Sequence, residues 1–141
     1  MSGAAPPRRA PRILIVDDDE DTRELYIESL NLAGFDASGA ADAPTALALA
    51  RTLAPAVITI DVSLPGLSGI EVTRLLKGDP ATRGILVFIL TGHVERRFSD
   101  EAAAAGCDAF IAKPCVPQVL LEHILRALGP RGPSGAFDAG S

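Results

Sequence analysis

The stretch ILIVDDDEDTRELY, residues 13–26, joins four aliphatic side chains directly to five consecutive acidic ones. A short continuous aliphatic run is typical of a strand that is buried on both faces of a sheet. From Thr22 onward, apolar residues recur at the spacing of a helix, and Gly34 follows where a helix-ending glycine belongs. The stretch therefore predicts a buried strand whose carboxyl end delivers acidic side chains to the start of a helix.

The same alternation of strand and helix repeats along the chain. Further aliphatic runs predict strands at residues 35–38, 57–60, 85–90 and 108–112. Further helices are expected to begin after Asp42, after Ser68, at about residue 95 and at Pro117. Five such units with short connections predict an α/β fold, a parallel sheet covered by helices on both faces.

Composition and charge fit one globular domain. The chain has 141 residues, of which 48% are hydrophobic and 22% charged, close to average globular usage. A net charge of -5 argues against a sequence-independent grip on nucleic acid, which needs clustered basic residues. The first apolar run is too short for a signal peptide or a transmembrane span, so a cytoplasmic location is expected. Cys107 and Cys115 fit no disulfide or metal pattern and are expected to be reduced.

Polar residues stand at the ends of the predicted strands. They are Asp17 and Asp18 after the first, Asp61 after the third, Thr91 after the fourth and Lys113 after the fifth. In such sheets, ligands bind beyond the carboxyl ends of the strands. Neighbouring carboxylates raise the cost of ionising one another, so they need a cationic partner. Oxygen-only ligands suit a hard cation, and we therefore expect Mg²⁺ at this edge.

The motifs around these residues resemble the receiver domain of two-component response regulators. They are IVDDD, DVSLPGLSG, LTG and IAKP, in the order and spacing of that family. The resemblance covers residues 12–128 and implies a CheY-like, flavodoxin-like (βα)5 fold, doubly wound, with strand order 2-1-3-4-5. The flanking residues 1–11 and 129–141, rich in Pro, Ala and Gly, are expected to be flexible tails.

The resemblance implies a metal site and a phosphoacceptor. Asp61 would be the nucleophile that attacks a phosphohistidine and becomes an aspartyl phosphate. The carboxylates of Asp17, Asp18 and Asp61, with the backbone carbonyl of Ser63, would hold Mg²⁺. The side chains of Ser63 and His93 would tune the lifetime of the phosphoryl group.

The resemblance also implies a phosphoryl-binding group and a switch. Lys113 would pair with one phosphoryl oxygen, and Thr91 would donate its hydroxyl to another. The shift of Thr91 would let Phe110 rotate inward, and a phenylalanine, lacking a hydroxyl, would act through packing alone. The bond between Lys113 and Pro114 is expected to be cis, because cis peptides are largely confined to proline.

The implied function is that of a stand-alone signalling module in a phosphorelay, not of an enzyme beyond its own phosphotransfer and dephosphorylation. A sensor histidine kinase or a histidine phosphotransfer protein would be the donor. The stretch after residue 128 is too short for a DNA-binding or catalytic effector domain. Output is therefore expected through a protein partner on the face of the fourth and fifth helices and the fifth strand, in a monomer or weak dimer.

Two other functions fit parts of the sequence. The stretch ILIVDDDEDT also resembles the haloacid dehalogenase phosphohydrolases, with Asp17 as nucleophile and Asp19 as acid and base. Those enzymes need a further acidic pair after the lysine motif, where this chain offers only Glu122. The third possibility is a receiver fold that binds its partner without phosphorylation, so that binding would be indifferent to Asp61→Ala.

Overall fold

The computed structural model describes residues 10–92 and 96–129, in which five strands and five helices alternate. The strands are β1 (Arg12–Val16), β2 (Asp36–Ala40), β3 (Val57–Asp61), β4 (Leu86–Thr91) and β5 (Ala109–Ala112). The helices are α1 (Glu20–Leu32), α2 (Ala43–Leu53), α3 (Gly69–Gly78), α4 (Arg96–Ala105) and α5 (Pro117–Leu128).

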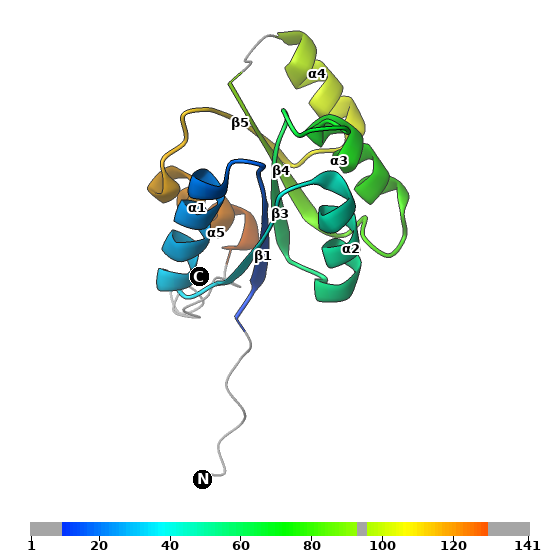
Figure 1. The fold of residues 1–141 in the computed structure, drawn as a ribbon. Coiled ribbons are helices and arrows are strands. Elements are labelled where there is room, and N and C mark those ends of the chain that lie inside the picture. Colours follow the sequence, from blue (N-terminus) through cyan, green and yellow to red (C-terminus); the bar gives the residue numbers. More distant parts are fainter. Residues whose placement is uncertain (1–9, 93–95, 130–141) are drawn as a thin grey trace.

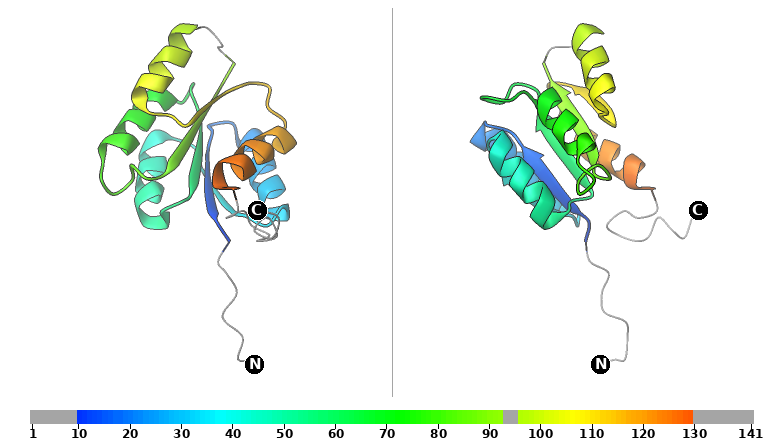
Figure 2. Two further views of the ribbon diagram at one scale, coloured as in Figure 1. Left: turned by 180° about the vertical axis from the view of Figure 1, so that it is seen from behind. Right: turned by 90° about the vertical axis from the view of Figure 1, so that its right-hand side faces the viewer.

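The strands form one sheet in the order β2-β1-β3-β4-β5, and every neighbouring pair is parallel. Helices α1 and α5 cover one face of this sheet, and α2, α3 and α4 cover the other (Figure 1). The two turned views in Figure 2 show the same three layers. The doubly wound α/β fold and its strand order, both predicted from the sequence, are confirmed.

Each face of the sheet has its own hydrophobic core, because successive strand residues point to opposite faces. In β1, Leu14 and Val16 join the core beneath α2, α3 and α4, while Ile13 and Ile15 join the core beneath α1 and α5. All four are at most 1% exposed. The aliphatic run of the opening stretch thus packs on both sides, as its composition predicted.

The main disagreement with the expected boundaries is at β2, which the sequence pattern predicts at residues 35–38 and which lies at Asp36–Ala40. Gly39 and Ala40 continue the strand because they pair with Ile15 and Val16 of β1. A side chain at Gly39 would meet Ile27 and Arg23 of α1, with Ile27 Cδ1 only 2.7 Å from its Cβ. The glycine that weakens the strand pattern in sequence thus lies against α1, and the side chains of Ile27 and Arg23 would have to shift to admit a larger residue.

Four helices have a described N-cap residue, and three of these caps are side-chain hydrogen bonds. Asp19 and Asp42 accept backbone hydrogen bonds at the starts of α1 and α2, and Ser68 forms a capping box with Glu71 at α3. Helix α5 begins at Pro117, and its N-cap residue, Val116, makes no side-chain hydrogen bond to the helix. This agrees with the apolar sequence that precedes it.

At the amino ends of β4 and β5, a polar network ties α3 to the sheet. Lys77 Nζ donates to the backbone oxygen of Ile85 at 2.8 Å and to Asp108 Oδ2 at 2.9 Å. The same Asp108 oxygen accepts from the backbone nitrogen of Val87 at 2.8 Å. Asp108 is therefore occupied by this anchor, and β5 begins one residue later than expected, at Ala109.

Some expectations fall outside the described residues. These are His93 and, apart from residues 10, 11 and 129, the two tails. Among the described residues, Cys107 and Cys115 are both free thiols, as expected. None of the helices described is long and apolar enough to cross a membrane.

Candidate functional site

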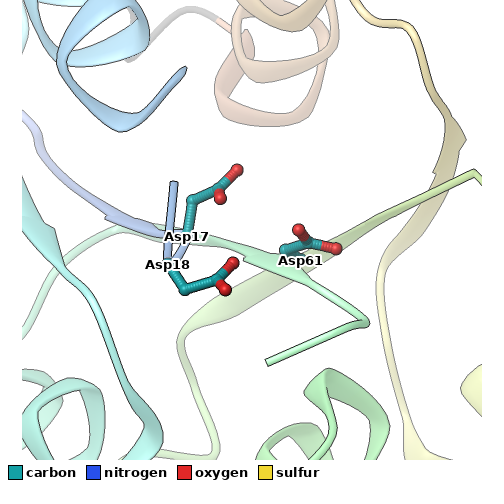
Figure 3. Close-up of side chains that lie close together, drawn as sticks. All are labelled: Asp17, Asp18 and Asp61. Atoms are coloured by element: carbon teal, nitrogen blue, oxygen red, sulfur yellow. The ribbon is translucent and has the colours of Figure 1, made fainter. Parts of the chain in front are cut away.

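Three carboxylates meet at the carboxyl edge of the sheet. Asp17 and Asp18 directly follow β1, and Asp61 is the last residue of the neighbouring β3. One oxygen from each lies within 4.8 Å of the others, and Figure 3 shows the three side chains gathered there. The parallel pairing of β1 with β3 thus brings together residues that are far apart in sequence.

Asp17 is the buried member of the group, 3% exposed. Its Oδ1 accepts a hydrogen bond from the backbone nitrogen of Asp19 at 2.9 Å. Burial raises the pKa of Asp17 above its usual value, although this hydrogen bond and the charge of Lys113 oppose the shift. Asp18 is exposed, so the pair offers one anchored and one accessible carboxylate.

Both oxygens of Asp61 have a hydrogen-bond donor. The backbone nitrogen of Ser63 donates to Oδ1 at 3.0 Å, and Lys113 Nζ donates to Oδ2 at 3.0 Å. The side chain of Asp61 is only 12% exposed. Its carboxylate is therefore held in one orientation beside the other two acids.

Lys113 reaches the acids from the segment that follows β5. Its Nζ lies 3.0 Å from Asp61 Oδ2 and 3.7 Å from Asp17 Oδ2. Burial alone would lower the pKa of Lys113, but the hydrogen bond to Asp61 and the charges of Asp61 and Asp17 outweigh it and raise the pKa. The lysine is thus a stable cation that offsets part of the negative charge. The Lys113–Pro114 peptide bond is cis, as the resemblance implied.

Thr91 and Phe110 lie on the two strands next to the site. Thr91 is fully buried at the end of β4, and its backbone oxygen accepts from the nitrogen of Lys113 at 2.8 Å. Phe110 pairs with Ile89 across β4 and β5, is half-buried, and packs against the core beneath α2, α3 and α4. The structure therefore places Thr91 beside Lys113 and Phe110 on the strand that leads to it.

The donor set fits a divalent cation. Among the described residues, the site gathers three carboxylates, of which Asp17 and Asp61 pair with one lysine, so negative charge is in excess at neutral pH. All donors are oxygens, which suits Mg²⁺ rather than a softer metal. Asp17, Asp18 and Asp61 could hold such an ion.

Three residues that support the site were not singled out in the sequence. A Cβ at Gly69 would lie 2.7 Å from the backbone oxygen of Asp61, so this glycine allows α3 to approach the acid. On α1, Arg23 donates a hydrogen bond to the backbone oxygen of Asp17, and Tyr26 donates one to the backbone oxygen of Cys115. The last glycine of DVSLPGLSG was the one available signal, whereas Arg23 and Tyr26 lie in an ordinary helical pattern.

These features define a class of protein, and comparison with known families agrees. The family model of the response regulator receiver domain matches residues 13–125. The chain therefore belongs to the response regulator receiver domains, the CheY-like signalling domains of two-component phosphorelays.

Individual relatives include long and short proteins. The chain is 38% identical to the response regulator PleD of Caulobacter vibrioides, over 83% of this chain and 26% of PleD. It is 35% identical to the phosphate regulon transcriptional regulatory protein PhoB of Pseudomonas aeruginosa, over 91% of this chain and 57% of PhoB. It is 32% identical to the polar-differentiation response regulator DivK of Brucella anthropi, over 83% of this chain and 95% of DivK. The chain thus spans only part of the first two.

Solved structures share the fold over nearly their whole length. Chemotaxis response regulator CheY4 of Vibrio cholerae superposes with a TM-score of 0.79 at 28% identity, covering 84% of this chain and 99% of CheY4. A CheY-like receiver domain protein from Methanospirillum hungatei gives a TM-score of 0.80 at 30% identity, over 86% of this chain and 96% of that one.

Proposed function

We propose that the chain accepts a phosphoryl group on Asp61 from a phosphohistidine of a kinase or phosphotransfer protein, with Mg²⁺, and that this modification switches its contacts with a protein partner. The observation that carries the proposal is the placement of Asp61 between Lys113 and the Asp17–Asp18 pair. Family membership supports the same function.

In the transfer step, an oxygen of Asp61 attacks the phosphorus of the phosphohistidine. The new P–O bond forms while the P–N bond breaks, and the electron pair of that bond returns to the imidazole nitrogen. Ser63 N and Lys113 Nζ hold the carboxylate in place before attack. Lys113 can then pair with a phosphoryl oxygen, because its ammonium already lies at the reacting group.

The Mg²⁺ ligands would be the carboxylates of Asp17, Asp18 and Asp61 and the backbone carbonyl of Ser63. A bound magnesium ion supplies positive charge that offsets the charge of the transferring phosphoryl group. Asp19 holds Asp17 in position through its backbone nitrogen. The protein's contribution is therefore a fixed, oxygen-lined edge that stays negatively charged.

The proposed switch runs from Thr91 to Phe110. A phosphoryl group adds about 1.5–2 negative charges and three acceptor oxygens at Asp61. Two charge-assisted hydrogen bonds, from Lys113 and Thr91, are worth about 1.5–3 kcal/mol each. Inverting an equilibrium between the inactive and active conformations from 1:99 to 99:1 needs about 5.5 kcal/mol, so the two bonds come close to the energy required. Because Phe110 has no hydroxyl, its inward rotation would change packing alone, and with it the surface of α4, β5 and α5.

Intact-mass spectrometry after incubation with Mg²⁺ and acetyl phosphate tests the phosphoacceptor. We expect one phosphoryl group on the wild type and none on Asp61→Asn. Asp36→Asn is the matched control, because Asp36 is an exposed acid on β2 that pairs only with Arg12 among the described residues. An adduct that survives Asp61→Asn would overturn the assignment.

Hydrogen exchange tests the proposed output face. Phosphorylation is expected to change amide protection in α4, β5 and α5 while leaving α2 unchanged, with Asp61→Asn as the unresponsive control. A partner that binds the wild type and Asp61→Asn equally would instead favour the phosphate-independent module.

The phosphohydrolase alternative finds no support in the geometry. It requires Asp17 as an accessible nucleophile, yet Asp17 is buried and its Oδ1 accepts the backbone hydrogen bond of Asp19. It also requires Asp19 as acid and base, yet that carboxylate caps α1 by accepting from Thr22. Asp61 also accepts a backbone hydrogen bond, but its side chain is 12% exposed against 5% for Asp17, which favours Asp61 as the nucleophile.

A further inference from the structure

Helix α1 contacts both loops that carry the site. Arg23 Nη1 donates to the backbone oxygen of Asp17 at 2.9 Å. Three residues later, the hydroxyl of Tyr26 donates to the backbone oxygen of Cys115. Because residues three apart share a helix face, one turn of α1 holds the segment after β1 and the segment after β5 at the same time.

The bond from Tyr26 to Cys115 is sheltered from water. Tyr26 is 4% exposed within the core beneath α1 and α5, and Cys115 is 7% exposed. Burial raises the pKa of Tyr26 to about 12, so its hydroxyl stays protonated and able to donate even in moderately alkaline solution. A phenylalanine would fill the same space but would remove this donor to the carbonyl.

The backbone around Lys113 is fixed from both sides. Its own nitrogen donates to the oxygen of Thr91 at 2.8 Å, and the carbonyl two residues later is the one that Tyr26 binds. Between these points, Lys113 Nζ must stay 3.0 Å from Asp61 Oδ2. A displacement of about 1 Å in such a loop is enough to misplace a reacting group.

We propose that Tyr26 is a positioning residue for phosphoryl transfer, which acts by holding the Cys115 carbonyl and thereby the ammonium of Lys113 beside Asp61. The inference rests on the proposed function of Asp61 as phosphoacceptor. It assigns to α1 a task beyond packing, because the hydroxyl and not the ring would be what the reaction needs.

A double-mutant cycle on the rate of phosphoryl incorporation tests this role. With acetyl phosphate and saturating Mg²⁺, Tyr26→Phe is expected to lower the initial rate roughly threefold to tenfold, the equivalent of one hydrogen bond. In a Lys113→Ala background, Tyr26→Phe should change the rate no further, because its effect passes through the lysine. Losses that multiply in the double variant would overturn the proposal.

Thr82→Val is the matched control. The hydroxyl of Thr82 also donates to a buried backbone oxygen, that of Leu76 at 2.8 Å, in the turn after α3. This variant should lose comparable stability and keep the wild-type rate, which separates positioning from general destabilisation. A wild type that takes up no phosphoryl group refutes the proposed function itself. If the wild type is phosphorylated and Tyr26→Phe is phosphorylated at the same initial rate, only the role of Tyr26 is refuted.

If Tyr26→Phe does not fold, fluorine NMR tests the coupling between Tyr26 and Lys113 instead. The chain has a single tyrosine, so 3-fluorotyrosine added to the growth medium labels position 26 alone. Beryllium trifluoride, a phosphoryl mimic, is expected to shift this resonance in the wild type and to leave it in place in Lys113→Ala. An equal shift in both chains would contradict the coupling.

Discussion

Gly69 is the first residue of α3, and its Cα faces the backbone that carries Asp61. An added Cβ would lie 2.7 Å from the Asp61 backbone oxygen and 3.0 Å from Val62 Cα. Because backbone cannot yield as a side-chain tip does, we expect Gly69→Ala to destabilise the fold by about 1–3 kcal/mol. The variant should also slow phosphoryl uptake, because Asp61 must shift. Urea unfolding and intact mass measure the two effects.

Gly78→Ala, at the other end of α3, is the matched control. A Cβ at Gly78 meets nothing within 4 Å. The substitution should therefore be neutral or stabilise the helix by up to about 1 kcal/mol. An equal loss of stability in Gly69→Ala and Gly78→Ala would show that the substitution in the helix, and not the contact with Asp61, causes the destabilisation.

Asp18 is the exposed member of the three carboxylates, so it can be neutralised without disturbing the core. Without divalent metal, Asp18→Asn should raise stability by up to about 1 kcal/mol, because it removes repulsion from Asp17 and Asp61. With Mg²⁺ at ten times its Kd, the wild type should gain about 1.4 kcal/mol. The Asp18→Asn variant should gain far less stability from the same concentration of Mg²⁺. Thermal unfolding with and without Mg²⁺ measures both effects, and a full response of Asp18→Asn would contradict the ligand role.

At the scale of elements, α5 lacks a side-chain cap, unlike the other three helices whose N-cap residue is described. Val116 already has the extended backbone of an N-cap residue and is 54% exposed. Val116→Ser should therefore stabilise the protein by about 0.5–1 kcal/mol, because a serine oxygen can accept a hydrogen bond from a backbone nitrogen of the first turn. Val119→Ser, inside the same helix, offers no such bond and should not stabilise. A shift in urea midpoint at constant slope checks the pair.

The elements themselves were largely predictable from local chemistry. Asp42 and Ser68 cap their helices as expected, because capping depends on residues three apart in sequence. The predicted extent of β2 was wrong, because Gly39 and Ala40 extend that strand through pairing with Ile15 and Val16 of β1. Such requirements come from elements distant in sequence, and no local pattern encodes them.

For the whole molecule, alkaline pH should reveal the buried tyrosine. The pKa of Tyr26 is raised to about 12 in the fold, against about 10 in an unfolded chain. The stability that it contributes is complete below pH ~10 and is lost as the pH rises toward 12. Lys113, whose pKa is also raised, contributes in the same direction, and comparison with Tyr26→Phe separates the two.

Ultraviolet absorbance of tyrosinate reads this titration directly, since the chain has one tyrosine and no tryptophan. The midpoint should lie near 12 in the native protein and near 10 in urea. A native midpoint close to 10 would mean that the hydroxyl is open to solvent.

Parallel topology explains how much of the site could be anticipated. Once five βα units were predicted, Asp17, Asp18, Asp61 and Lys113 had to meet at one edge, because all strands end there. The hydrogen bonds from Arg23 and Tyr26 to the loops could not be anticipated, because they link side chains on α1 to backbone oxygens of distant segments. Sequence pattern locates the acids, whereas three-dimensional packing determines what orients them.

The anchor formed by Lys77, Asp108 and Val87 holds the amino end of the short strand β5, and the bond from Lys113 N to Thr91 O holds its other end. Asp108 is fastened immediately before the strand begins, while Lys113 stands just beyond its other end. Strand β5 is therefore tethered at both ends, at Asp108 and at Lys113. The proposed inward rotation of Phe110 would then be a change of side-chain rotamer within a strand whose backbone stays in place.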